Sequence, residues 1–256
     1  MKHLTSQDEQ MARQMIGLLD LTSLNAKGNE QRIIEICQRA VTPVGLVAAV
    51  CVYPNAVQLA RRTLNKLHGE TVRVAAVVNH PYCKADIETA VTDTRIGLVW
   101  GADEIELMYP HRQLLTGDRQ NGKDMVSACR SACGDRAVLK VVLDTGHLKD
   151  PQLIRKACED IIAAGADFID THSDKAIIGA SSQAARIILE VIAEIGGQGG
   201  LKVTAGMRTF EEARVYLELA RSRFGPHWVN ANHVRFGGAS LRDDLLMGLG
   251  VLAPGG

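Results

Sequence analysis

The sequence has no excess of charge of either sign, no long apolar run and no closely paired cysteines. Its 29 Lys and Arg residues balance its 29 Asp and Glu residues, so no bulk field favours binding to nucleic acid or to an anionic membrane. No apolar stretch reaches the ~18 residues that span a bilayer, and the charged start MKHLTSQDEQ is unlike a signal peptide. We therefore expect a cytoplasmic protein without nucleic-acid or membrane partners.

The cysteines form no CxxC pair, and several occupy apolar positions of expected helices or strands. This pattern favours buried free thiols over disulfides or a zinc site. The six are Cys37, Cys51, Cys83, Cys129, Cys133 and Cys158. We expect neither a metal nor any other cofactor.

Eight short apolar runs rich in Val and Ile recur along the chain, separated by segments with helical periodicity. The runs span residues 17–24, 44–52, 72–79, 102–109, 137–144, 168–173, 201–206 and 234–240. Helix starts are marked by Asp150 with Pro151 and by a capping box of Thr209 and Glu212. Apolar strands alternating with amphipathic helices indicate a parallel sheet covered by helices.

Eight such units in 256 residues predict a closed (β/α)₈ barrel. An open doubly wound sheet is the alternative architecture. No linker, low-complexity tract or change of composition divides the chain, so we expect a single domain over residues 1–256, with a short helix before the first strand. Catalytic groups of such barrels lie at the carboxyl ends of the strands.

Strand side chains alternate between the barrel lumen and the helices, and this parity places several charges in the lumen. The inward set is Asp20, Glu104, Glu106, Lys140, Asp144, Asp170 and Lys202. Unpaired buried charges are strongly destabilising, so these groups must pair. The pairs could form a purely structural network, or the amines near acids could serve proton transfer or Schiff-base chemistry.

Glycines near the ends of the last two strands predict an anion site. TAGMRT (204–209) and RFGGAS (235–240) each precede a helix. Backbone amides at such positions, together with the helix dipole, can bind phosphate, although glycines there also serve simply as turn residues.

Six stretches occur in the order found in the deoxyribose-phosphate aldolase family, and together they span nearly the whole chain. They are LLDLTSLN, TPVGLVAAVCVYP, GADEIELMYP, LKVVLDTGHLKD, AGADFIDTHSDK and RFGGASL. The sequence therefore resembles that family of class I aldolase barrels. The resemblance implies cleavage of 2-deoxyribose 5-phosphate to glyceraldehyde 3-phosphate and acetaldehyde, through a Schiff base on a lysine of the sixth strand.

The resemblance also reveals departures from the family pattern. Asp170 stands where the family has its Schiff-base lysine, and a carboxylate cannot form an imine. Lys202 and Lys140 match family lysines of strands seven and five, while Glu106 matches an aspartate that assists proton transfer. Native deoxyribose-phosphate aldolase activity is therefore doubtful.

The anion site departs from the family as well. Ala205 and Ala239 replace a glycine and a serine, and Asp174 brings negative charge near the expected phosphate position. The chain also ends in GVLAPGG, without the terminal tyrosine of many members.

The expected site residues form three groups. The catalytic group is Asp170, Lys202, Glu106 and Lys140. The substrate-binding group is Asp20, Thr22, Cys51, Asp144, Thr171 and His172. The phosphate-binding group is Ser173, Lys175, Gly206, Gly237, Gly238 and Ser240.

The sequence favours an aldolase-like enzyme acting on a small carbonyl or sugar-phosphate-like substrate by aldol, retro-aldol or related acid–base lyase or cyclisation chemistry. Either Lys202 supplies a new Schiff base, or Asp170, Glu106 and the lysines act as general acids and bases. A non-catalytic binding or regulatory homologue, with Asp170 paired to Lys202, is the main alternative. The sequence leaves homo-oligomerisation open.

Metal-dependent chemistry is a further alternative, which the nearby lysines argue against. Its ligands would be Glu104, Glu106, Asp144, Asp170 and His172. His80 and His147 follow strands three and five, where they could reach the mouth of the site, but loop histidines are more often solvated bystanders.

Overall fold

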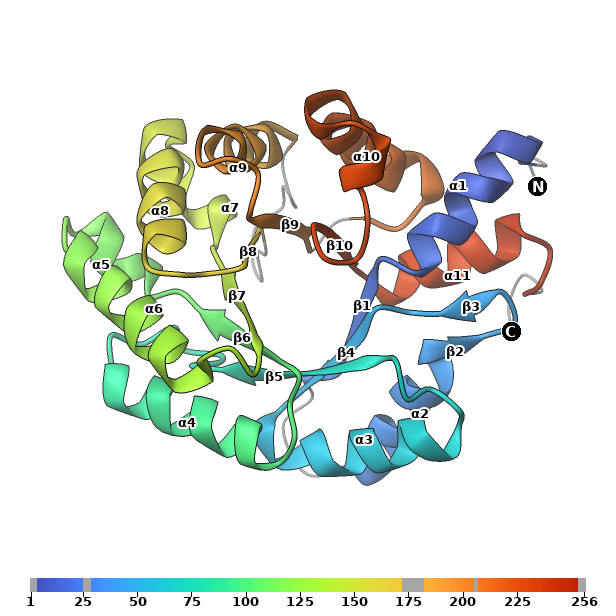
Figure 1. Ribbon diagram of the computed structural model, residues 1–256, viewed down its shortest axis with the longest axis horizontal. Coiled ribbons are helices and arrows are strands. Elements are labelled where there is room, and N and C mark those ends of the chain that lie inside the picture. Colours follow the sequence, from blue (N-terminus) through green and yellow to red (C-terminus); the bar gives the residue numbers. More distant parts are fainter. Residues whose placement is uncertain (1–3, 25–28, 172–181, 205–206, 253–256) are drawn as a thin grey trace.

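The computed structural model describes residues 4–24, 29–171, 182–204 and 207–252. Eight parallel strands close into a barrel in the order β1-β10-β9-β8-β7-β6-β5-β4, and helices surround the ring (Figure 1). The strand β1 is hydrogen-bonded to both β10 and β4. This closure confirms the predicted (β/α)₈ barrel and excludes the open sheet.

The barrel strands are short and almost wholly buried. They are β1 (Leu19–Thr22), β4 (Ala49–Val52), β5 (Arg73–Val78), β6 (Glu104–Met108), β7 (Val138–Val142), β8 (Phe168–Asp170), β9 (Gly200–Val203) and β10 (Val234–Gly237).

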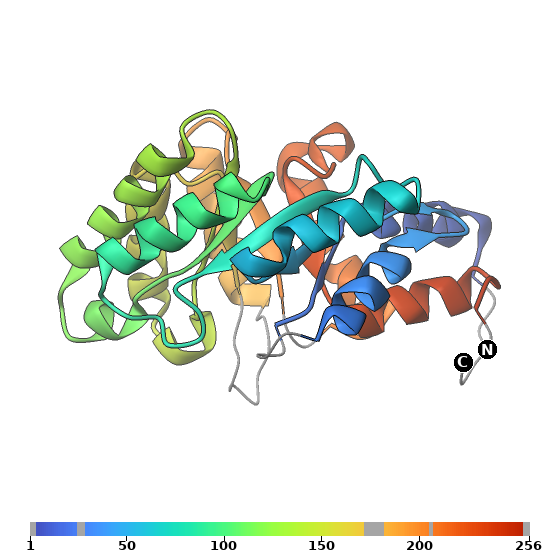
Figure 2. The same cartoon turned by 90° about the horizontal axis from the view of Figure 1, so that it is seen from below.

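Helices precede the first strand and follow every strand of the barrel. They are α1 (Ser6–Ile16), α2 (Glu30–Ala40), η1 (Pro54–Ala56), α3 (Val57–Lys66), α4 (Ile87–Val99), α5 (His111–Leu115), α6 (Arg119–Cys133), α7 (Thr145–Leu148), α8 (Pro151–Ala163), α9 (Ser182–Glu194), α10 (Phe210–Phe224), η2 (Pro226–Trp228) and α11 (Ala239–Gly248). The first and last helices, α1 and α11, lie side by side (Figures 1 and 2).

The second apolar run, residues 44–52, contains two strands rather than one. Its start, β3 (Gly45–Leu46), pairs antiparallel with β2 (Val41–Thr42) in a small hairpin outside the barrel. The Thr42 hydroxyl donates to the Gly45 carbonyl at 2.6 Å, and Gly45 has φ +139°, a conformation that favours glycine. Residues 47 and 48 separate this hairpin from β4, which alone joins the barrel.

The sequence signals for helix starts correspond to real caps. The Asp150 side chain accepts from the Gln152 N–H at the start of α8. Thr209 and Glu212 form a reciprocal capping box at the start of α10. Both caps fix where the chain turns from the end of a strand into the covering helix.

Two apolar clusters fill the molecule. The larger lies between the strands and the surrounding helices. The smaller includes Cys51, Ala75, Val77, Met108 and Val142, from strands β4 to β7. These residues share the inward parity of the charged set, so one side of the lumen is apolar. Within the described ranges, no helix is both long enough and apolar enough to cross a membrane.

Candidate active site

A cavity of about 470 Å³ opens at the carboxyl ends of the barrel strands. Its lining combines apolar residues with the charged groups of β6, β8 and β9. The lining residues are Thr22, Leu24, Val77, His80, Pro81, Glu106, Met108, Val142, Asp170, Lys202 and Thr204. This is the end of the barrel at which enzymes of this architecture carry out chemistry.

Lys140 is the centre of a buried ion network beneath the cavity. Its Nζ lies 2.6 Å from Asp20 Oδ2, 2.6 Å from Glu104 Oε2 and 2.8 Å from Glu106 Oε1. The lysine is fully buried, and its contact with Asp20 is a hydrogen bond. Three short charge-assisted contacts offset the cost of removing the ammonium from water.

Arg235 adds a second buried cation that the sequence analysis did not place in the lumen. Its guanidinium donates to Asp20 Oδ1 at 2.7 Å and to Glu104 Oε1 at 2.8 Å, and it lies over the Phe168 ring at 5.6 Å. Strand parity could have indicated this position, because Arg235 and Gly237 are two residues apart in RFGG and therefore face the same side of the strand.

Lys202 connects the buried ion network to the lumen cavity. Its Nζ donates to Glu106 Oε1 at 2.6 Å and lies 3.4 Å from Asp170 Oδ2 and 3.5 Å from Asp20 Oδ2. Asp170 is the register partner of Lys202 on the neighbouring strand, and its Oδ2 also accepts from the Thr204 hydroxyl at 2.8 Å. An ammonium and two carboxylates therefore meet at the floor of one cavity.

The network sets the protonation of its members. Burial alone would lower the pKa of Lys202, but Glu106, Asp170 and Asp20 outweigh it and hold that pKa well above its usual value. Burial would raise the pKa of Glu106, yet Lys140 and Lys202 lower it to about 2. Lys202 is therefore an ammonium, without the lone pair that attack on a carbonyl requires, and Glu106 is a carboxylate.

The buried charges nearly balance. Four carboxylates, those of Asp20, Glu104, Glu106 and Asp170, face three fully buried cations, Lys140, Lys202 and Arg235. A fourth cation, Arg73, approaches Glu104 at 3.6 Å with a side chain 40% exposed.

A smaller cavity of about 270 Å³ adjoins the first and shares Thr22 and Thr204 with it. It is also lined by Arg208 and by the segment from Gly237 to Ser240, where α11 begins. Free amides at a helix start, a guanidinium and a serine hydroxyl are groups that bind oxyanions. The predicted phosphate residues Gly237, Gly238 and Ser240 lie here, whereas Arg208 is an addition to that prediction.

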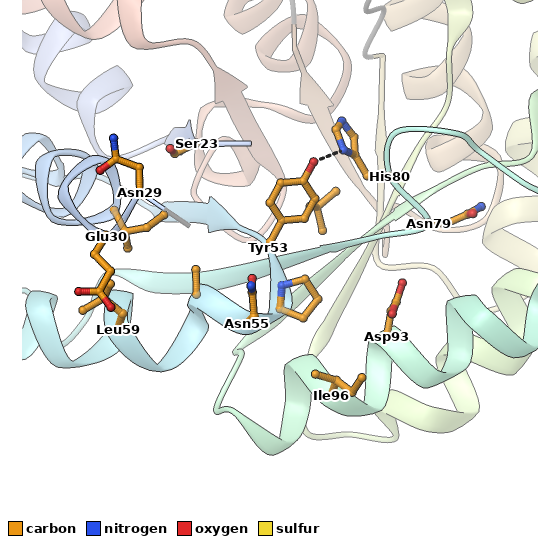
Figure 3. Close-up of a pocket in the computed structure, with 14 residues that line it drawn as sticks. Ser23, Asn29, Glu30, Tyr53, Asn55, Leu59, Asn79, His80, Asp93 and Ile96 are labelled. Carbon is orange, nitrogen blue, oxygen red and sulfur yellow. Dashed lines mark hydrogen bonds between the residues drawn. The ribbon is translucent and has the colours of Figure 1, made fainter. Parts of the chain in front are cut away.

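A third cavity, of about 590 Å³, lies beside the mouth of the barrel and shares Val77 and His80 with the lumen cavity. The Tyr53 hydroxyl and His80 Nδ1 are 2.9 Å apart (Figure 3), and His80 lines both cavities. Asn55 and Asp93 also line it. The third cavity therefore adds polar side chains beside the lumen cavity.

The sequence profile of the DeoC/LacD family of aldolases matches residues 14–246. The chain belongs to this aldolase family. Membership supports an aldolase-like function and agrees with the resemblance found in the sequence.

Solved structures share the architecture of this aldolase-family chain. A protein of Toxoplasma gondii ME49, assigned as a deoxyribose-phosphate aldolase, has a TM-score of 0.85 at 22% identity, over 97% of each chain. One from Coccidioides immitis with the same assignment has a TM-score of 0.76 at 23% identity, over 90% of this chain and 83% of that one. The tetrameric deoxyribose-phosphate aldolase of Aeropyrum pernix has a TM-score of 0.72 at 19% identity, over 98% and 100%. At these identities the likeness shows the fold.

The predicted site residues divide between the cavity and the layer beneath it. Thr22, Glu106, Asp170 and Lys202 line the lumen cavity of this aldolase-family protein. Four other predicted residues are buried outside that lining: Asp20, Lys140, Cys51 and Thr171. Lys140, predicted as catalytic, contacts Glu106 at 2.8 Å from the layer beneath the cavity.

Asp144 lies at the rim instead of in the lumen. The strand β7 ends at Val142, and Asp144 caps α7 by accepting from the His147 N–H at 3.1 Å. Its other oxygen lies 2.6 Å from His147 Nδ1. Inward parity predicted from Lys140 therefore does not extend past the end of the strand. His172, Ser173, Lys175 and Gly206 lie outside the described residues.

All six cysteines are buried, and none forms a disulfide. Cys51 lies beside the ion network, donating to Glu106 Oε2 at 3.2 Å. Burial, followed by the Glu106 carboxylate, raises the pKa of this thiol well above its usual value. Cys51 is therefore a buried thiol that donates a hydrogen bond, unlike the exposed thiols of lowered pKa that act as nucleophiles.

Proposed function

We propose that the protein is a carbon–carbon lyase that makes or breaks an aldol bond in a small carbonyl substrate by acid–base chemistry, without a covalent imine. The observation that carries this proposal is the floor of the lumen cavity, where the Lys202 ammonium meets Glu106 and Asp170. A protonated amine held by carboxylates is a proton donor and an electrostatic clamp.

In the cleavage direction, Asp170 accepts the proton of the substrate's β-hydroxyl. The bond between the α and β carbons breaks, the hydroxyl carbon becomes the carbonyl of the first product, and the electron pair passes into an enolate. The Lys202 ammonium stabilises the enolate oxygen, which lies within the same low-dielectric cavity. The proton taken by Asp170 returns to the α carbon, so the reaction needs no oxidant, reductant or other co-substrate.

The adjoining cavity supports an anionic group, such as a phosphate, on the substrate. It shares Thr22 and Thr204 with the lumen cavity, so a ligand anchored there reaches Asp170 and Lys202. Anchoring a remote group positions the reacting carbon atoms and lowers the entropic part of the barrier.

Borohydride trapping tests the absence of an imine. The protein is incubated with β-hydroxy aldehydes, ketones and their phosphates, treated with borohydride, digested and analysed by peptide mass spectrometry. We expect turnover that survives borohydride and no reduced adduct on the peptide containing Lys202. A trapped adduct at Lys202 that disappears in Lys202→Met would refute the mechanism.

Asp170→Lys is the matched positive control. It restores the family's amine at the position facing Lys202 and replaces a negative charge by a positive one, which favours the neutral, nucleophilic form of the new amine. We expect this variant to give a borohydride-trapped adduct at position 170 with an aldehyde, which shows that the assay detects imines in this cavity.

One observation favours a second function, that of a metabolite-binding homologue without catalysis. Asp170 and Lys202 form an ion pair, and such a pair can be purely structural. On this account, no member of a panel of aldehydes and sugar phosphates is turned over faster by the native protein than by Lys202→Met, although a sugar phosphate still raises the unfolding temperature.

A further inference from the structure

Three potential metal ligands gather on the rim of the barrel, outside the lumen cavity. His111 opens α5, directly after β6, while Asp144 and His147 cap and build α7, directly after β7. Neither histidine belonged to the expected site. None of the three lines the lumen cavity.

The three side chains are close enough to share one ion. One ring nitrogen of each histidine and one Asp144 oxygen all lie within 4.8 Å of one another. The two imidazole rings stack with centroids 5.4 Å apart and an interplanar angle of 30°. The Asp144 carboxylate is already oriented, because its Oδ1 accepts the His147 N–H and its Oδ2 faces His147 Nδ1.

His111 provides an independent indication of a missing partner. The residue is 9% exposed, and its Nδ1 is buried with no hydrogen-bond partner among the described residues. A buried polar nitrogen without a partner is costly, and such groups usually mark a water or an ion. His147 differs, since its side chain is 42% exposed and can adjust.

We propose that His111, Asp144 and His147 form a binding site for a divalent transition metal such as Zn²⁺. Two imidazoles and one carboxylate are ligands that zinc prefers over the all-oxygen sets of Mg²⁺ and Ca²⁺. Three protein ligands leave the remaining coordination positions to water or to an anion.

Binding requires one small adjustment. Ligand atoms around tetrahedral zinc lie about 3.3 Å apart when the bonds are about 2.0 Å, so the 2.6 Å contact between Asp144 Oδ2 and His147 Nδ1 must open. Rotation of the exposed His147 ring supplies this movement, while the buried His111 and the capping Asp144 stay in place. The metal then ties the loop after β6 to the loop after β7.

Zinc titration of the full-length protein tests the site. The protein, stripped with EDTA and kept reduced, is titrated with ZnCl₂ by isothermal calorimetry, and thermal unfolding is followed with and without ZnCl₂. We expect one Zn²⁺ per chain with micromolar or tighter affinity, a higher unfolding temperature with zinc, and no comparable shift with MgCl₂. Failure to bind zinc at micromolar concentrations overturns the proposal.

Variants locate the ion. His147→Ala removes an exposed ligand with little effect on folding, and Asp144→Asn keeps the cap of α7 because asparagine also caps helices. Each should weaken zinc binding by about tenfold or more, whereas His227→Ala, which removes an exposed histidine far along the sequence, should leave it unchanged. Undiminished binding in both rim variants assigns the zinc to another site and overturns the proposal.

Discussion

At the scale of single residues, Asp170 sets the charge beside Lys202. Its Oδ2 lies 3.4 Å from the Lys202 Nζ. Coulombic attraction from Asp170 is one of the reasons why the pKa of Lys202 is raised. Asp170 thus helps to keep the neighbouring amine protonated, which in the proposed function favours acid–base over imine chemistry.

Asp170→Asn separates the charge of this residue from its shape. The amide can still accept from the Thr204 hydroxyl, so we expect the fold to persist, while loss of the base lowers kcat by about 10²–10⁴-fold. Steady-state kinetics on the substrate found by screening measures this. Asp118→Asn, a conservative change at the exposed cap of α6, is the control. Equal kcat in the native protein and Asp170→Asn contradicts the proposed role.

Lys140→Met tests the residue beneath the cavity. The change leaves Asp20, Glu104 and Glu106 without their shared ammonium, and breaking such a buried network costs about 3–5 kcal/mol. Urea unfolding measures the free energy. Lys66→Met, at an exposed position of α3, should change it by less than about 0.5 kcal/mol. A Lys140→Met protein as stable as the native one would show that the network contributes nothing.

At the scale of secondary-structure elements, the close packing of β9 against β10 helps to position the Asp170 carboxylate. A Cβ at Gly237 would lie 2.6 Å from Thr204 Oγ1, closer than such contacts occur. Thr204 in turn donates to Asp170. Because Gly237 in β10 has no side chain, Thr204, directly after β9, has room to orient the Asp170 carboxylate at the end of β8.

Gly237→Ala should displace Thr204 and lower kcat by about tenfold or more, because small misplacements of a reacting group are costly. The matched control is Gly17→Ala, where a Cβ would make an ordinary 3.5 Å contact with the Gln14 carbonyl. Kinetics and urea unfolding should both be recorded. A loss of stability with unchanged kcat would place the role of Gly237 in folding alone.

At the scale of the whole molecule, the charged lumen makes folding sensitive to acid. The pKa of Glu106 falls from an ordinary 4.5 to about 2 on folding, so the stability that it contributes is complete above pH 4.5 and is lost as the pH falls towards 2. Asp20 shifts in the same direction. We expect the urea midpoint to fall steadily over this range, and Glu106→Gln to make the fall smaller. A flat midpoint contradicts the expectation.

Much of the barrel could be predicted from the sequence, because apolar runs and helix caps are local signals. The hairpin before β4 could not be predicted, because the continuous apolar run 44–52 does not indicate where one strand ends and the next begins. Strand parity correctly placed Lys140 and Lys202 in the lumen. Which carboxylates each lysine contacts could not be predicted, because that depends on the register of neighbouring strands and on the conformation of the lysine side chain. The proximity of His111 and His147 depends on two loops meeting at the rim, which no local pattern encodes.

The two sides of the lumen have a consequence for stereochemistry. Val77, Met108 and Val142 form an apolar wall of the cavity, and Lys202 with Asp170 forms a charged one. A substrate whose oxygen faces the ammonium and whose hydrocarbon part faces the apolar wall can present only one of its two prochiral faces. An aldol addition in this cavity should therefore give a product with a single configuration at the new carbon centre.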